Sequence, residues 1–271
     1  MVAMKLFKYD ENNRTHRLIR MAVIIAISLL TFLAIWWIVT IWMNNVNFPT
    51  PDKVFEALYN LIVYGDRMGG HSLWEYLATS LSTFIEGFLM ALVVAIPLGL
   101  LLGYIKPIRE FITPWIEVLR PIAPIAWAPI FIISFGSAMG SALVVFVGIV
   151  FPLLTSIIFG VQRIDKNWLD ASKTLGASQG QIFCKVVLPA TVPYILNGMK
   201  VGLGIGWMCI VAAEMYKRTG GIGQFLVDAV NNGLMSTAFA IIIVIAVLGI
   251  LTTGVAEYVS KYVSRRMGLD A

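Results

Sequence analysis

The chain has 271 residues, of which 59% are hydrophobic and 13% are charged. Soluble domains carry about twice that charged fraction, so the composition excludes an ordinary soluble protein and indicates membrane spans. The net charge of +5 comes from Lys and Arg residues that flank the apolar stretches on one side. It therefore does not indicate binding to nucleic acid.

Long stretches without charged residues predict the transmembrane helices, because a helix needs about 20 apolar residues to cross the bilayer. The first stretch ends at Pro51, and a short amphipathic helix outside the membrane is expected at residues 54–63. Six spans are expected: one within residues 21–51, one within 87–105, two within 121–162, one at about 194–213 and one within 229–256.

The distribution of Lys and Arg predicts the orientation, because these residues favour the cytoplasmic ends of membrane spans. They are frequent near both termini, between the second and third spans, and between the fourth and fifth spans. Both termini are therefore expected in the cytoplasm. The predicted organisation is a cytoplasmic tail at residues 1–20, a six-helix domain at 21–262 with a cytoplasmic loop at about 163–189, and a second tail at 263–271.

The most informative stretch lies between the fourth and fifth spans, from Asp170 to Pro189. Its composition predicts a short helix, a break and a second helix. Asp170 favours a helix start, where backbone N–H groups lack partners. Gly176 permits the backbone to bend, and Pro189 suits the first turn of the next helix. A small apolar face, suited to a groove on a partner, is expected from Leu169, Ala171 and Leu175.

This stretch resembles the cytoplasmic "EAA" loop of ABC importer permeases. The family pattern is Glu-Ala-Ala, three residues, Gly, nine residues, an aliphatic residue, one residue and Leu-Pro. Asp170, Ala171 and Ser172 stand in the first three places, and Val186 fills the aliphatic place. The resemblance implies a coupling helix that docks on an ATPase subunit and involves Asp170, Ala171, Ser172, Leu175, Gly176, Leu188 and Pro189. The alternative is an ordinary loop between two helices.

Further motifs resemble the nitrate, sulfonate, taurine and bicarbonate branch of these permeases. They are RPIAPIAWAPIFIISFG at residues 120–136, VAAEM at 211–215 and GGIGQFLVDAVNNG at 220–233. The resemblance covers roughly Leu73 to the C-terminus. It implies an all-α type I ABC importer permease fold in a bacterial or archaeal inner membrane. It also implies a second permease copy, two ATPase subunits and a periplasmic or lipid-anchored solute-binding protein.

Two residues of the third span are candidates for the solute pathway. Arg120 could face an anionic solute, pair with Glu117 on the same helix, or reach the cytoplasmic headgroups. Trp127 could form a gate or pack between helices. Three prolines accompany them, Pro121, Pro124 and Pro129, and such a helix is expected to face other helices or a cavity rather than lipid.

Glu214 is the third pathway candidate, near the external end of the fifth span. It could shape an outer gate, or form an ion pair with Lys217 or Arg218. On the same span, glycine recurs every fourth residue at Gly198, Gly202 and Gly206, and this spacing predicts close approach of another helix. Gly99 and Gly103 form a similar pair on the second span.

No enzymatic site is predicted. The chain has no G-x-x-x-x-G-K-[ST] motif, so ATP hydrolysis, with its magnesium ion, is assigned to a separate ATPase chain. No metal-ligand spacing is present, and no cofactor is expected on this chain. The spans also lack the convergent polar groups that an intramembrane enzyme requires. A secondary transporter or channel that works without an ATPase remains the alternative function.

Overall fold

The computed structural model describes residues 14–43, 45, 47–65, 72–217 and 220–266, and the regular elements in this part of the chain are all helical. The predicted tails lie largely outside the described residues. The helices are α1 (Arg14–Met43), α2 (Pro51–Tyr64), α3 (Leu73–Tyr104), α4 (Lys106–Leu119), η2 (Pro124–Trp127), α5 (Ala128–Phe135), α6 (Ser137–Gln162), α7 (Lys166–Thr174), α8 (Gln179–Ile182), η3 (Phe183–Val187), α9 (Leu188–Glu214), α10 (Ile222–Asn231) and α11 (Met235–Arg266).

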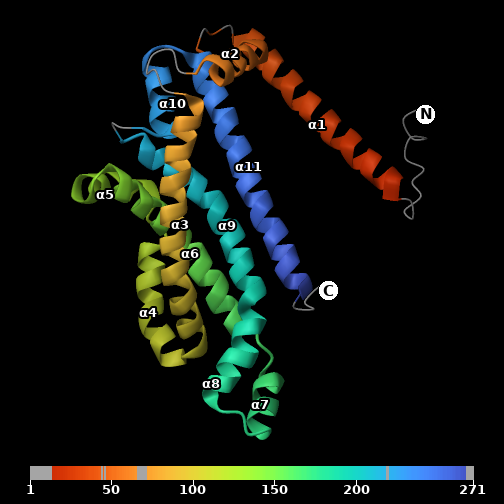
Figure 1. Cartoon of the computed structure of the whole chain (residues 1–271), viewed down its shortest axis with the longest axis vertical. Helices are drawn as coiled ribbons and strands as arrows, with labels where there is room; N and C mark the ends of the chain where they lie inside the picture. The colour runs from red at the N-terminus through yellow and green to blue at the C-terminus, as the bar shows by residue number, and fades with distance from the viewer. Residues whose placement is uncertain (1–13, 44, 46, 66–71, 218–219, 267–271) are drawn as a thin grey trace.

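The long helices α3, α6, α9 and α11 run lengthwise through the molecule (Figure 1). Helices α2 and α10 lie at one end, and α7 and α8 lie at the opposite end. Helix α1 leaves the α2 end and diverges from the bundle (Figure 1), and its apolar side chains from Met21 onward are mostly exposed. Among the described residues, five helices are long and apolar enough to cross a membrane, and a bent pair makes up to six. The predicted all-α fold is thus confirmed, with five or six candidate spans.

The third span differs from the single helix that was expected. Helix α4 already begins at Lys106, in the segment predicted to connect two spans, and it meets the η2–α5 segment at an angle of 82°. The break coincides with Pro121 and Pro124. Proline lacks an N–H group and clashes with the preceding helical turn, so two prolines three residues apart favour a break at these positions. The prolines therefore divide the span rather than lie within one helix.

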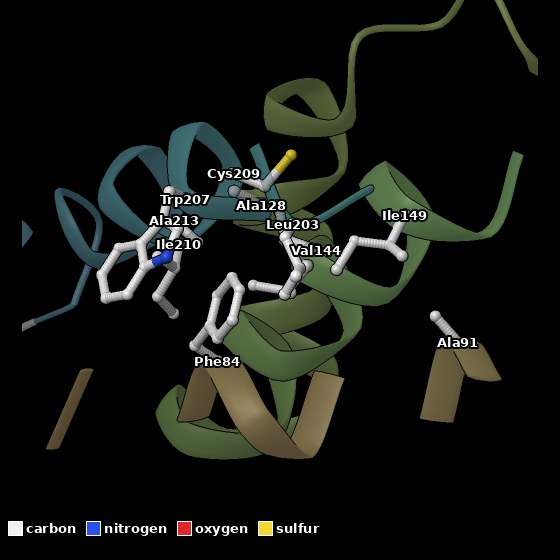
Figure 2. Packing of buried hydrophobic residues seen from close by; sticks show 11 residues of the cluster. Phe84, Ala91, Ala128, Val144, Ile149, Leu203, Trp207, Cys209, Ile210 and Ala213 are labelled. Carbon is white, nitrogen blue, oxygen red and sulfur yellow. The ribbon is translucent and has the colours of Figure 1, made fainter. Parts of the chain in front are cut away.

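Three helices, α3, α6 and α9, form the centre of the molecule. The Phe84 ring of α3 stacks on the Trp207 ring of α9, with centroids 4.8 Å apart. Figure 2 shows both rings beside Val144 and Ile149 of α6, which are fully buried. The Trp207 indole Nε1–H donates to Thr252 Oγ1 at 2.8 Å, so α11 is joined to the same core. The buried cluster thus holds four of the spanning helices together.

Glycines permit the close approach of α9 to α6, as their spacing predicted. A Cβ atom at Gly202 would lie 2.7 Å from Ile149 Cγ2, and one at Gly206 would meet Ile149 Cδ1 and Phe84 Cε2, each at 2.8 Å. Gly198 lies against Leu153 and Ser156 in the same manner. The close helix contact predicted at the glycine pair of α3 is also confirmed, because Gly99 and Gly103 face Ile157 and Val161 of α6.

We expect Gly202→Ala to lower the melting temperature of the purified protein, whereas Gly204→Ala will not. Both glycines lie on α9, but a Cβ atom at Gly204 would meet nothing within 4 Å. Overpacking at Gly202 costs about 1–3 kcal/mol, while alanine at Gly204 improves helix propensity by about 1 kcal/mol. Thermal unfolding of both variants in one detergent measures the difference. Equal melting temperatures would show that the glycine contacts do not limit helix packing.

Candidate functional site

Helix α7 lies in the loop between α6 and α9, at the end of the bundle opposite α10 (Figure 1). It begins earlier than predicted. The N-cap is Asp165, whose carboxylate accepts from the Asn167 backbone N–H at 2.9 Å. Asp170, which was expected to start the helix, lies in its middle and pairs with Lys173 at 3.1 Å. Helix α6 ends at Gln162, with Arg163 as its C-cap, and Asp165 then provides the side-chain oxygen that caps α7.

The end of α7 is a Schellman motif built on Gly176. The Ala177 N–H donates to the Ser172 carbonyl oxygen at 3.0 Å, and the Gly176 N–H donates to the Lys173 carbonyl oxygen at 2.9 Å. Gly176 has φ of +78°, a conformation that glycine adopts without steric cost. The predicted bend at Gly176 is therefore confirmed, and it ends the helix sharply after Leu175.

One face of α7 presents an apolar stripe to solvent, defined by Trp168, Ala171 and Leu175. Leu175 is 87% exposed and Trp168 is 59% exposed, and the spacing i, i+3, i+7 places the three side chains on one side. Leu169, expected on this face, instead packs into the core of its own chain. Sequence reasoning missed Trp168, which its helical spacing from Leu175 could have revealed. Ser172 is half-buried, and its hydroxyl donates to the Trp168 carbonyl oxygen at 2.7 Å.

The rest of the loop connects this stripe to the membrane helices. Ser178 and Gln181 form a capping box at the start of α8, and the Tyr104 hydroxyl of α3 donates to Gln179 Oε1 at 2.7 Å. A π-helical turn, η3, then leads into α9. Leu188 and Pro189 form the first turn of α9 and do not share the exposed face of α7. They belong to the link between α7 and the bundle.

A single buried cluster joins the loop to three spans. Leu169 and Ala177 of the loop, with Ile182 and Val187 beyond them, pack in the same cluster as Leu102 of α3 and Ile157 of α6. Close-packed side chains resist compression, so a displacement of α7 is passed to the helices that it touches. The arrangement can therefore transmit a mechanical movement from the loop into the membrane.

Arg120 and Trp127 lie on the two sides of the bend in the third span. Arg120 is exposed at the C-cap of α4. Among the described residues it makes no ion pair with Glu117 or with any other acid. Trp127 is half-buried in η2 and stacks on Phe131, with ring centroids 5.6 Å apart. Phe131 packs against the central core, so Trp127 connects the bend to that core.

Glu214 is fully buried in a polar network at the end of the bundle opposite α7. Its Oε2 atom accepts from the Ser80 hydroxyl at 2.8 Å and from the Gly223 backbone N–H at 3.0 Å. The Ser80 oxygen in turn accepts from the Ile222 backbone N–H at 2.8 Å. Glu214 therefore fastens the first turn of α10 to α3 and α9, where free N–H groups favour a carboxylate.

Lys217 completes this network. Its Nζ atom lies 4.0 Å from Glu214 Oε1, and its side chain is only 2% exposed. Burial lowers the pKa of Lys217, and the Glu214 carboxylate opposes that shift. Arg218, the other partner considered for Glu214, lies outside the described residues. A Cβ atom at Gly221 would lie 2.5 Å from the Glu214 carboxyl carbon, so glycine is needed there for the carboxylate to fit.

Comparison with known proteins gives consistent matches. Residues 95–265 match the family described as binding-protein-dependent transport system inner membrane component. A putative ABC transporter permease protein of Methanocaldococcus jannaschii, MJ0413, is 37% identical over 84% of this chain and 86% of its own length. The nitrate import permease protein NrtB of a Synechocystis species is 35% identical over 83% of both chains. The taurine transport system permease protein TauC of Escherichia coli is 34% identical over 83% of this chain and 82% of its own length.

A solved structure has a similar fold. It is a chain of the MetNI methionine ABC transporter in an inward-facing conformation, with a TM-score of 0.58 and 17% sequence identity. The alignment covers 72% of this chain and 97% of that chain. The arrangement of helices described above is therefore shared with a chain of that transporter over the aligned part.

Proposed function

Because the chain belongs to the family of binding-protein-dependent transport system inner membrane components, we propose that it imports a small anion of the nitrate, sulfonate or taurine, or bicarbonate class. The relatives named for nitrate and taurine transport support this solute class. The observation that carries the proposed mechanism is the exposed apolar stripe on α7, at one end of a packed core.

The chain is the permease component of an ABC importer and not its ATPase. It is a multi-pass protein of the inner membrane, and an importer of this kind requires an ATPase and a solute-binding protein as partners. Family membership removes the alternative of a secondary transporter or channel. In our proposal, ATP and its magnesium ion bind to the ATPase, and this chain binds no cofactor.

The coupling mechanism begins at α7. In each of two permease copies, Trp168, Ala171 and Leu175 insert into a groove of one ATPase subunit. ATP binding brings the two ATPases together, and α7 moves with them. The cluster around Leu102 and Ile157 passes this movement to α3 and α6. An equilibrium between inward-open and outward-open states then shifts, because the ATP-bound ATPases favour one of them.

The solute follows a path between the two copies. The solute-binding protein delivers it at the end where α2 and α10 lie, and Arg120 contacts its anionic group deeper in the membrane. Trp127, beside the bend, narrows the path. Glu214 is buried and fastened to α10, so we assign it to holding the external gate rather than to contact with the solute.

Reconstitution tests the proposed function. The tagged permease is purified from its native membrane, its co-purifying chains are identified, and the complex is placed in proteoliposomes with its binding protein. We expect a nucleotide-binding subunit in the complex, and ATP-dependent uptake of labelled nitrate, taurine or bicarbonate. A complex without an ATPase would contradict the coupling mechanism, and uptake of none of the three anions would contradict the solute class.

We expect Gly176→Val to leave membrane insertion intact but to uncouple ATP hydrolysis from uptake. A β-branched residue is strained at φ of +78°, so the turn that places Leu175 will change. The matched control is Gly180→Val, because Gly180 does not have positive φ, and a Cβ atom there also meets nothing within 4 Å. The ratio of solute transported to ATP hydrolysed is the measurement. A normal ratio in the Gly176 variant would contradict this role of the turn.

A further inference from the structure

Helix α4 carries a row of polar residues along one face. Lys106, Glu110, Thr113, Glu117 and Arg120 follow the spacing i, i+4, i+7, i+11, i+14, which places them on a single side of a helix. Arg120 shares this side because its backbone is still right-handed helical, with φ −58° and ψ −41°. We refer to these five residues as the polar face of α4.

Apart from Arg109, whose guanidinium group donates to the Gly103 carbonyl oxygen at 3.1 Å, the other sides of α4 are apolar. Ile108, Ile112 and Ile116 pack against the buried cluster that includes Leu102 of α3 and Ile157 of α6. Phe111, Trp115 and Val118 are exposed, at 64%, 59% and 69% respectively. Exposed apolar side chains of this kind suit contact with lipid. The polar face is exposed too, since Lys106 and Glu110 are 74% and 64% exposed and Glu117 and Arg120 are also exposed.

Helix α4 and the η2–α5 segment together are long and apolar enough to cross a membrane as one bent span, which would place the end of this face inside the bilayer. The first residue of α4, Lys106, lies two residues after Tyr104, whose hydroxyl contacts the loop between α6 and α9, and the helix then runs beside the lower half of α3 (Figure 1). Fourteen residues extend about 21 Å, or roughly two-thirds of a hydrocarbon core of about 30 Å. Charged side chains at such depth face water or protein, because contact with lipid is costly.

The charges near the bend lack partners that would neutralise them. Lys106 and Glu110 pair with each other at 3.7 Å, but no ion pair involves Glu117 or Arg120 within the described residues. Backbone carbonyl oxygens near the bend also lack their usual helical partners. Pro121 and Pro124 occupy the positions whose N–H groups would bond to the carbonyl oxygens of Glu117 and Arg120. Helices broken inside a membrane are found where the freed backbone lines water or is covered by protein.

We propose that the polar face of α4 lines a water-filled vestibule that opens to the cytoplasm and through which the transported solute leaves. Arg120 lies at the inner end of the vestibule and contacts the anionic group of the solute. Glu117, one turn below, balances the charge of Arg120, so that an anion is not held too tightly to be released. This inference rests on the proposed import function, to which it adds the exit route and the role of Glu117.

Cysteine accessibility tests the vestibule. The background carries Cys184→Ser and Cys209→Ala, which remove the two native thiols. Single cysteines replace Glu117 or Arg120 on the polar face, and Trp115 or Val118 at similar depth on the apolar face. Glu110→Cys serves as a shallow positive control. The full chain is expressed with its ATPase partner, without nucleotide, and a membrane-impermeant charged methanethiosulfonate is applied to inside-out vesicles.

We expect the Glu117→Cys and Arg120→Cys variants to react at least about ten times faster than Trp115→Cys and Val118→Cys, because the reactive thiolate forms in water and not in lipid. Equal rates on the two faces would overturn the proposal. So would reaction only in right-side-out vesicles. Disulfide cross-linking between two copies of the Glu117→Cys variant, without reaction with the reagent, would also overturn it, because it would show that the face is covered by protein.

This test is independent of the coupling mechanism. If the polar face is accessible but no ATPase co-purifies with the permease, the vestibule stands and the proposed coupling fails. If the ATPase binds but the thiols of Glu117→Cys and Arg120→Cys are inaccessible, the vestibule is wrong and the coupling stands. A shallow thiol added to each variant by Glu110→Cys reports insertion by its own reaction. A variant that fails to insert into the membrane is recognised by the missing reaction of this shallow thiol. The other variant on the same face of α4 then gives the reaction rate for that face.

Discussion

Leu175→Asp will abolish stable association of the permease with its ATPase. Leu175 is 87% exposed at the end of α7, where it forms no part of the core of its own chain, so the substitution leaves the fold intact. Burial of a leucine in a partner's groove contributes about 1.5–3 kcal/mol, and an unpaired carboxylate in that groove costs more. Together these effects weaken binding by at least about a hundredfold, since each 1.4 kcal/mol is a factor of ten.

The measurement is the amount of ATPase that co-purifies with the tagged permease, followed by ATP hydrolysis in proteoliposomes. Thr174→Asp is the matched control. It introduces the same carboxylate at the same end of α7, but about 100° away around the helix from Leu175. Retention of the ATPase in the control and its loss in Leu175→Asp supports the exposed stripe as the docking surface. Normal co-purification of the Leu175 variant would show that the ATPase binds elsewhere.

Glu214→Ala will destabilise the external end of the bundle strongly. The substitution leaves the Lys217 ammonium group, which is 2% exposed, without its anion, and it removes the acceptor of two hydrogen bonds from Ser80 and Gly223. Breaking a buried ion pair by removing one partner costs about 3–5 kcal/mol. A lower melting temperature in detergent and faster proteolysis between α9 and α10 are expected.

Three further variants separate charge from hydrogen bonding in this network. Glu56→Ala removes an exposed carboxylate from α2, and it will leave the melting temperature nearly unchanged. Glu214→Gln retains a hydrogen-bond acceptor of similar size, so its loss of stability will be smaller than that of Glu214→Ala. Adding Lys217→Met to Glu214→Gln removes the ammonium group that Glu214→Gln leaves without an anion. The double variant will therefore recover part of the stability that Glu214→Gln loses. Glu214→Ala at wild-type stability would show that the network does not hold α10.

The two ends of the molecule differ in the side chains that they expose and bury, which suggests that they have different functions. At one end, α7 presents exposed apolar side chains that are suited to a partner. At the opposite end, a buried polar network fastens α10 to α3 and α9. The long helices that connect the ends approach closely where glycines of one helix face side chains of the next. Such contacts let helices move as rigid bodies, which is what alternating access requires.

Local sequence patterns determined much of this protein. Apolar stretches between charged residues predicted the spans, because the bilayer selects for length and composition. The distribution of Lys and Arg predicted the orientation. Gly176 predicted the turn after α7, and the glycines at every fourth residue predicted the contact of α9 with α6. The Asp170–Pro189 motif predicted a coupling role for its loop, because its residues are contiguous and their spacing can be read directly, and that role stays a prediction.

Only the tertiary structure decided which side of each helix is covered. Periodicity placed Leu169 near the docking face, but packing against α3 and α6 turned it inward and left Trp168 exposed. Composition suggested a single third span, whereas two prolines divide it and leave the polar face of α4 uncovered by its own chain. Ser80 and Glu214 are 134 residues apart in sequence, and no local pattern connects them. Their hydrogen bond exists because the fold brings α3, α9 and α10 to one point, where burial favours a hydrogen-bond partner for the Ser80 hydroxyl and for Glu214 Oε2.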